Sequence, residues 1–200
     1  WWARRMEEDD YPGYDDPERM REIIYWTTLA LRLPPDRIDV VFPTEEACRD
    51  RLVSVRWPDG VRCPFCGGTA ISELTKRRLF RCRSCRVQFS ATSGTLLHNT
   101  HVPALLWFLG AERLIRTHAI AGCGFHVSGR YLAQKLGLSY RGAVRMKETL
   151  LRDMGPSGPG LLRESVCVDQ FSHPDEMQAG SADHALWLQI NLLDRRTPAW

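Results

Sequence analysis

The chain has 200 residues, enough for one large domain or for two or three small ones. Its formal net charge at neutral pH is only +3, which excludes a protein that coats DNA with a uniformly basic surface. No apolar run reaches the roughly 20 residues that cross a bilayer and no secretory signal is present, so we expect a cytoplasmic, nucleoid-associated protein without membrane contact.

Residues 1–41 are predicted to form an acidic opening segment followed by a helix. Acidic side chains crowd the first residues, and Pro12-Gly13 favours a loop or disordered chain as far as Tyr14. Asp16-Pro17 is typical of a helix N-cap followed by proline at the first helical position. Pro34-Pro35 then ends the helix, because proline lacks the backbone N–H that a continuing helix needs.

Residues 42–98 are predicted to contain a second helix and a zinc ribbon. Thr44 is a suitable N-cap for a helix that continues to about Val55, and a turn follows at residues 57–60. Two C-x2-C pairs come next, with fifteen residues between them, which is the spacing of zinc ribbons. A tight C-x2-C turn brings two thiolates to one side of a tetrahedral ion, and a hairpin of this length returns the second pair to the other side.

The four cysteines of these pairs are therefore predicted to bind one metal ion: Cys63, Cys66, Cys82 and Cys85. Zinc is expected, and a site closed by four thiolates is structural and not catalytic. Iron is the nearest alternative, since rubredoxin-like sites use the same pairs, but the strongly basic surroundings favour contact with phosphate over electron transfer. Three further cysteines are expected to be small buried residues: Cys48, Cys123 and Cys167. His98 and His101 have no third ligand near them in the sequence, so a second metal site is not expected there.

Basic residues gather around the second cysteine pair, with only Glu73 opposing them. The predicted DNA-binding residues of this segment are Lys76, Arg77, Arg78, Arg81, Arg83 and Arg86. A solvated charged face is the alternative. We favour nucleic-acid contact, because a metal-held fold would fix these charges on a surface of one sign.

Residues 99–154 are predicted to be a helical DNA-binding region. Pro103 opens one long helix, and two shorter helices are separated at Gly137-Leu138-Ser139. The two shorter helices have the pattern of a helix-turn-helix, and a plain helical hairpin is an equally good interpretation. In the first case a recognition helix would present Arg141, Arg145 and Lys147 to DNA.

The last part of the chain is predicted to be a linker at residues 155–160 followed by strands. Glycine and proline dominate residues 155–160. Ser165–Phe171 and Leu186–Leu193 have the apolar content expected of strands. The whole pattern predicts an α+β fold.

The motifs of this sequence, taken in order, resemble zinc-ribbon insertion-sequence transposases over about residues 42–171. The segments that carry the resemblance are Phe42-Pro-Thr-Glu-Glu-Ala-Cys48, Arg56-Trp-Pro-Asp-Gly60, Cys63-Pro-Phe-Cys-Gly67, Arg81-Cys-Arg-Ser-Cys85, Phe89-Ser-Ala-Thr-Ser-Gly-Thr-Leu-Leu-His98, Trp107 and Leu136-Gly-Leu-Ser-Tyr-Arg-Gly-Ala143. The resemblance implies a transposase that recognises double-stranded DNA at transposon ends, possible self-association into a homo-oligomer, and a ribonuclease-H-like catalytic domain with three acidic residues.

Asp169 matches the first of these acids, which the family carries on the first strand of the catalytic domain. Such sites use Mg²⁺ or Mn²⁺, which we expect only for an intact domain, and several carboxylates must hold the ions. Asp175, Glu176, Asp183 and Asp194 follow without a spacing that marks them as the missing acids. Residues 161–200 are therefore expected to be an incomplete catalytic domain in a truncated copy or fragment, one that binds DNA better than it cuts it. A non-catalytic zinc-ribbon transcription regulator is the alternative.

Overall fold

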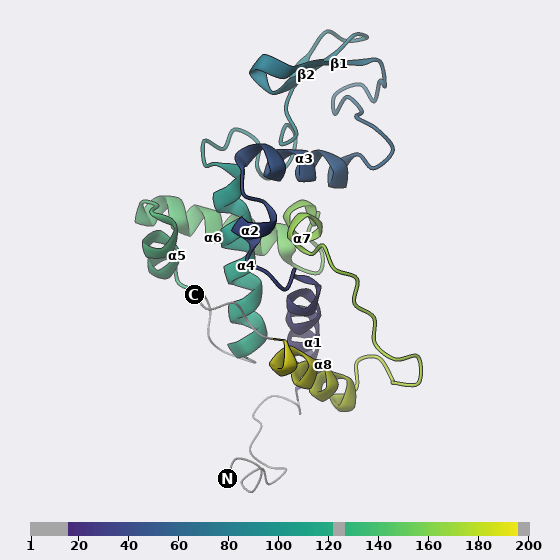
Figure 1. Cartoon of the computed structure of the whole chain (residues 1–200), viewed down its shortest axis with the longest axis vertical. Coiled ribbons are helices and arrows are strands. Elements are labelled where there is room, and N and C mark those ends of the chain that lie inside the picture. Colours follow the sequence, from purple (N-terminus) through teal and green to yellow (C-terminus); the bar gives the residue numbers. More distant parts are fainter. Residues whose placement is uncertain (1–15, 122–126, 196–200) are drawn as a thin grey trace, which may run out of the picture.

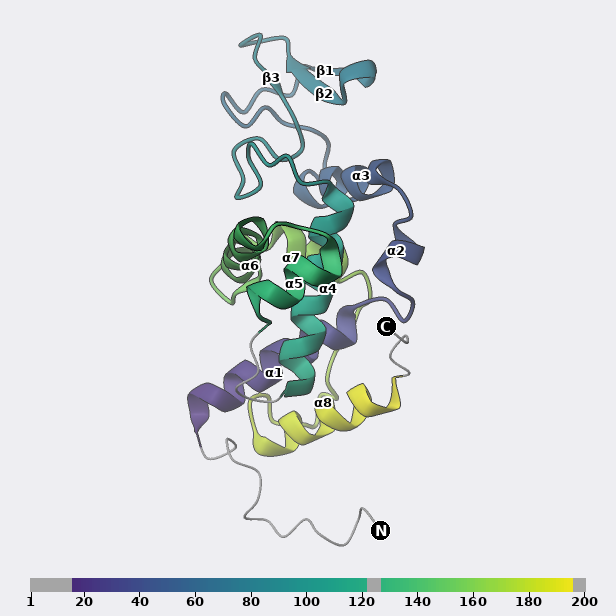
Figure 2. The ribbon, with the colours of Figure 1, turned by 90° about the vertical axis from the view of Figure 1, so that its left-hand side faces the viewer.

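The computed structural model describes residues 16–121 and 127–195 and shows a small zinc-ribbon-like sheet at one end of a helical body (Figure 1). The predicted acidic loop lies outside these residues. The sheet and α8 (Ala182–Asp194) mark opposite ends of the long axis, and the other helices lie between them (Figure 2). The α+β prediction is confirmed.

The two helices predicted before the cysteine pairs begin and end where local chemistry predicts. In α1 (Pro17–Arg32) the backbone N–H of Glu18 donates to the Asp16 carboxylate at 2.9 Å, and Leu33 caps the other end directly before Pro34. A single turn, α2 (Ile38–Val41), leads to α3 (Glu45–Arg56), where Thr44 accepts a hydrogen bond from the backbone of Ala47 at 3.1 Å. Both predicted helices are therefore confirmed.

The long helix α4 (Ala104–Ala121) is the centre of the body. The Glu45 carboxylate accepts hydrogen bonds from the backbone N–H groups of Ala104 and Leu105, at 2.8 and 3.1 Å, and so binds the start of α4 to the start of α3. A negative group is favourable there because the first N–H groups of a helix have no partners within it. Phe108 and Leu114 are fully buried on α4, in a core that continues through α1, α6, α7 and α8.

Two helices joined by a three-residue turn follow, as predicted. α5 (Gly129–Leu136) ends at Gly137, whose φ of 64° is left-handed, and α6 (Tyr140–Met154) begins after Ser139, which accepts a hydrogen bond from the backbone of Gly142. A Cβ at Gly129 would lie 2.6 Å from a methyl carbon of Val144, so glycine is needed for the close approach of these helices.

The two C-terminal strand predictions are wrong. Residues 186–193 lie within α8, whereas of residues 165–171 the first two end α7 (Leu161–Val166) and the others are irregular. The Asp153 carboxylate accepts hydrogen bonds from the backbone of Leu161, Leu162 and Arg163, which fixes the first turn of α7. Ser181 caps α8 in the same way, accepting from His184. A short apolar run does not distinguish a buried helix from a strand, and here the caps decide.

Residues 155–160, predicted as a linker, form a tight connection between α6 and α7. Backbone N–H groups of Gly158 and Gly160 donate to the carbonyls of Gly155 and Asp153, at 2.9 and 3.0 Å. α7 and α8 then pack in the same core as α1 and α4, so residues 161–194 are continuous with the helical body.

Candidate metal centre and nucleic-acid interface

The ribbon is a three-stranded antiparallel sheet in the order β1 (Ile71–Leu74), β2 (Leu79–Cys82) and β3 (Gln88–Phe89), with the 3-10 turn η2 (Thr75–Arg77) at the hairpin tip. Phe80 is paired with Phe89 on β3, and Arg81 with Ser72 on β1. Because side chains alternate along a strand, Phe80 and Cys82 face inward while Arg81 faces solvent.

Each cysteine pair forms a knuckle, a tight turn that ends in a left-handed residue. In the first knuckle, the backbone N–H of Gly67 donates to the carbonyl of Cys63 at 2.9 Å, and Gly67 has a φ of 72°. In the second, Arg86 takes the matching position with a φ of 64°. The hairpin between the knuckles brings the two pairs face to face, as the sequence spacing predicts.

The four cysteine sulfurs fit a tetrahedral metal ion. All four Sγ atoms lie within 4.8 Å of one another, with Cys63–Cys85 and Cys66–Cys82 distances of 3.6 Å. A zinc–sulfur distance of about 2.3 Å requires sulfurs about 3.8 Å apart in a tetrahedron. Among the described residues, this is the one cluster of three or more metal-binding side chains within ligand distance, so the exposed His98 and His101 are not part of one.

Backbone donors favour the thiolate form of two of these cysteines. Hydrogen bonds from the backbone of Cys85 and then Ser84 lower the pKa of Cys82 to about 6, although burial opposes them. Burial raises the pKa of Cys63, but hydrogen bonds from the backbone of Phe65 and Cys66 outweigh it and the net pKa is lowered. These N–H groups point at the sulfurs that must lose their protons to bind a metal, so the residues present fit the ion.

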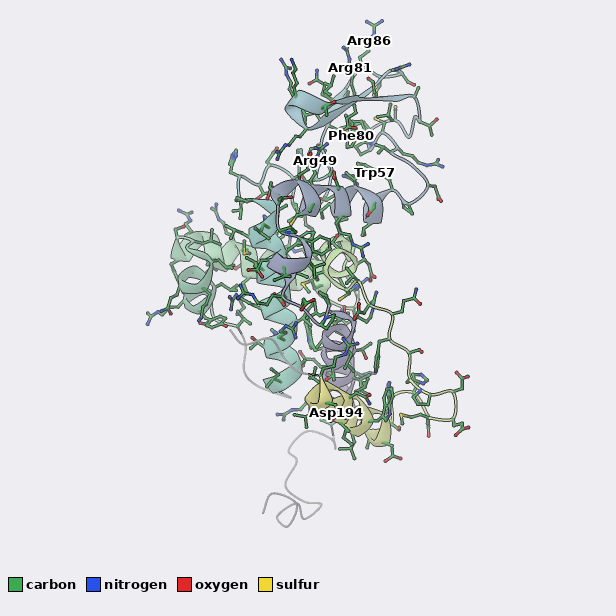
Figure 3. All side chains as sticks on the ribbon, viewed as in Figure 1. Arg49, Trp57, Phe80, Arg81, Arg86 and Asp194 are labelled. Carbon is green, nitrogen blue, oxygen red and sulfur yellow. The ribbon has the colours of Figure 1, made fainter. Side chains whose placement is uncertain are left out.

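Aromatic and cationic side chains hold the ribbon on α3. Trp57, at the end of α3, makes edge contacts with Phe80 and Phe89, each with ring centroids 5.9 Å apart. Arg49 forms an ion pair with Glu73 of β1 at 3.2 Å, and its guanidinium lies 5.8 Å from the ring centre of Phe80. Figure 3 shows Arg49, Trp57 and Phe80 in the layer between α3 and the sheet. Sequence reasoning missed this role of Arg49, because only the fold brings Glu73 to it.

The predicted basic residues of the ribbon are all exposed: Lys76, Arg77, Arg78, Arg81, Arg83 and Arg86. Arg81 and Arg86 extend from the face of the sheet that points away from α3 (Figure 3). Within the described residues, none of these six side chains forms a hydrogen bond or ion pair. The structure therefore gathers six exposed basic side chains in the ribbon, with Arg78 on the side that lines a pocket with Glu45 and Arg49 of α3.

The predicted residues of α6 are separate from the basic residues of the ribbon. Arg141 and Arg145 are exposed one helical turn apart, Lys147 is half-buried, and Glu148 and Arg152 continue the exposed face. Tyr140, at the first position of the helix, is 65% exposed. α6 thus presents a mixed but mainly basic face beginning at its N-terminus.

Asp169 lies just after α7 and not on a strand, so that part of the prediction is wrong. Its backbone N–H donates to the carbonyl of Arg32 at 3.0 Å, and its carboxylate lies 3.6 Å from the guanidinium of Arg195. No other acidic side chain joins it in a candidate metal cluster of the described chain. A catalytic role for Asp169 stays a prediction. Cys48 and Cys167 are buried as expected, while Cys123 lies outside the described residues.

The fold and the four-thiolate cluster define a zinc-ribbon protein with a structural metal site. Residues 43–88 match the family described as "Transposase zinc-ribbon domain", so the ribbon is similar to those of that family. The chain is also 27% identical over 133 residues to a Halobacterium salinarum protein described as "Uncharacterized protein in transposable element ISH50". That alignment covers 65% of this chain and 42% of the relative, so the chain spans less than half of that protein. No solved structure matches the chain.

None of the described helices combines the length and the continuous apolar character that crossing a bilayer requires.

Proposed function

We propose that the chain binds double-stranded DNA, at the ends of an insertion sequence, through the basic surface of the ribbon and the exposed face of α6. The matches to a transposase ribbon and to a protein of a transposable element support this role. The proposal concerns binding and leaves strand transfer to a complete catalytic domain.

The observation that carries the proposal is that some basic side chains are bonded within the protein and others are not. Eight arginines that lie in or against the helical body are bonded to carboxylates or to backbone carbonyls, whereas the exposed Arg21, Arg130 and Arg152 of the body are not bonded in this way within the described chain. The bonded residues are Arg32, Arg37, Arg49, Arg51, Arg56, Arg116, Arg163 and Arg195. Among the described residues, the six basic ribbon side chains and those of Arg141, Arg145 and Lys147 have no such bonds. Free guanidinium groups on a rigid support are suited to phosphate, because the contact releases counterions from DNA.

We expect the basic surface of the ribbon and the exposed face of α6 to contact different parts of the DNA. The ribbon residues lie on a sheet and knuckle, and we assign to them phosphate contacts that do not depend on sequence. In helix-turn-helix proteins the second helix enters the major groove with its N-terminal residues against the bases. The three-residue turn before α6 and the exposed Tyr140 and Arg141 fit that arrangement.

We further propose that the metal of the four-thiolate site is zinc. Cys63, Cys66, Cys82 and Cys85 would hold it, closing the site and fixing the two knuckles. Elemental analysis of the purified chain should give one zinc per chain and a colourless protein. Iron, with visible absorption, would support the alternative of an electron carrier.

DNA binding is tested by fluorescence anisotropy with duplexes carrying the element's ends or a scrambled sequence, over a series of salt concentrations. Replacing Lys76, Arg77 and Arg78 together with alanine should weaken binding to both duplexes alike. The log–log salt slope should fall by roughly 0.9 for each DNA phosphate that the variant no longer neutralises. Replacing Arg141 and Arg145 should instead reduce the preference for the element's ends.

Arg21→Ala is the matched control, because it removes one exposed positive charge from α1, a helix that carries none of the residues proposed to bind DNA. It should leave the affinity and the salt slope unchanged. Equal affinity of the wild type and both sets of variants, or no binding by the wild type, would reject the proposal. Sequence-specific binding at a promoter, without preference for element ends, would favour a transcription regulator.

A further inference from the structure

The described chain contains three non-glycine residues with left-handed backbone, and two of them are ribbon arginines. Arg78 has a φ of 53°, Arg86 of 64° and Asn99 of 59°. Asparagine adopts this conformation more readily than other residues, because its short side chain bonds to the local backbone. Arginine has no such advantage, and its Cβ crowds the following carbonyl.

The two knuckles give an internal comparison. Glycine occupies the left-handed position after the first cysteine pair and arginine the same position after the second. In the part of the chain that the structure describes, the exposed Arg86 side chain makes no hydrogen bond or ion pair that would stabilise the knuckle. Glycine would therefore suit the local fold better, and the arginine side chain must serve something outside it.

Arg78 is the second exposed arginine with a left-handed backbone in the ribbon. It follows η2 as a left-handed cap immediately before β2, and its side chain is exposed and likewise unbonded within the described chain. Arg81 lies between the two positions on the outward face of β2. The strand and its flanks thus present the exposed guanidinium groups of Arg78, Arg81 and Arg86. Two of them, those of Arg78 and Arg86, belong to residues whose left-handed backbone glycine would adopt without strain.

We propose that Arg78 and Arg86, the arginines at the two strained positions, contact DNA phosphates, and that the hairpin tip and the second knuckle form the contact surface of the ribbon. The first knuckle, with Gly67 in the corresponding place, lies outside this surface. This inference rests on the proposed DNA binding and adds that stability and binding oppose each other at these two positions.

The test compares glycine and alanine at each position in the zinc-loaded full chain. Arg86→Gly and Arg86→Ala both remove the charge, but only alanine keeps the strained Cβ. We expect both to weaken duplex binding by roughly tenfold, as for the removal of one charge-assisted hydrogen bond. The glycine variant should denature at a higher temperature than the alanine variant, because alanine keeps the strained Cβ of the wild-type arginine and glycine removes it. Arg78→Gly and Arg78→Ala should behave in the same way.

An exchange of the two knuckle residues separates position from charge. Gly67→Arg combined with Arg86→Gly keeps the net charge and one left-handed arginine, and a Cβ at Gly67 would meet no atom within 4 Å. We expect the exchanged protein to fold, to bind metal and to remain as weak in DNA binding as Arg86→Gly. Binding at the wild-type level would show that charge alone matters and would overturn the inference.

The remaining outcomes are also decisive. If the wild type binds DNA and Arg78→Gly and Arg86→Gly bind equally well, the inference is wrong while the proposed function stands. If the glycine variants lose stability, the arginines serve the ribbon fold and the inference is again wrong. If the wild type does not bind duplex DNA at all, the proposed function itself fails.

Discussion

The ribbon and the helical body are stabilised in different ways. The buried cluster of the ribbon consists of Cys63, Phe80, Cys82 and Phe89, and two of these are proposed metal ligands. The core of the body, in contrast, is continuous through α1, α4, α6, α7 and α8 and needs no ion. A fold with so few buried residues depends on the free energy of metal binding, whereas the body has enough apolar burial of its own.

The largest expected effect is loss of the metal. A strong chelator should unfold the ribbon and leave the helices intact, because the ribbon core contains its own ligands. Far-ultraviolet circular dichroism should change little, while the fluorescence of Trp57, packed on Phe80 and Phe89, should change strongly. A Trp57→Phe variant should lose this fluorescence change, which would assign the change to Trp57. Simultaneous loss of helix would show that ribbon and body form one cooperative unit.

A cavity in the helical body is expected to destabilise the body and to leave the ribbon unchanged. Phe108 is fully buried on α4, and Phe108→Ala should lower the free energy of unfolding of the body by about 3–5 kcal/mol. The metal content should not change, because no buried residue of the described chain belongs to both cores and only the half-buried Val53 packs against both. Denaturant unfolding followed by circular dichroism, together with a zinc assay, measures both. Loss of zinc from this variant would contradict the separation.

A smaller effect is expected at the junction of α6 and α7. The Asp153 side chain is almost fully buried and accepts three backbone N–H groups at the start of α7. Asp153→Ala should lower the stability of the body by about 2 kcal/mol, at the upper end for removal of a helix cap. Thermal unfolding measures the change, and Asp50→Ala, at an exposed position on α3, is the control. Equal stability of the two variants would mean that water replaces the cap.

The smallest effect is a pH dependence at Glu164. Burial raises the pKa of Glu164, but hydrogen bonds from Arg32 and Arg163 outweigh it, and the net pKa is lowered. The contribution to stability is therefore present above the unfolded pKa of about 4.3 and is lost as the pH falls through the lower folded value. Because the Glu164 side chain is 41% exposed, solvent screening keeps the gain below about 1 kcal/mol. Comparison of Glu164→Gln with the wild type from pH 3 to 6 should show the difference vanishing at the acid end.

Local signals in the sequence were sufficient to predict the four-cysteine cluster and most helices. The cysteine spacing predicts the ribbon because a hairpin of that length has few ways to place two knuckles around one ion. Asp16, Thr44 and Ser139 mark helix starts because each cap bonds within three residues of itself. These interactions are short-range, so the sequence contains them directly.

Only the tertiary structure decided how the C-terminal part folds and which arginines are bonded within the protein. Residues 186–193 are apolar enough for either a strand or a helix, and packing on α1 selects α8. The Ser181 cap, which bonds three residues ahead of itself, is a local signal that the strand prediction did not take into account. The α7 helix depends on Asp153, a side chain eight residues before the first N–H that it binds. Arg49 and Arg86 are both arginines near the ribbon in sequence, yet one is bonded to Glu73 and the other is free at a left-handed turn. Such differences depend on which distant residues the fold brings together, and no local pattern contains them.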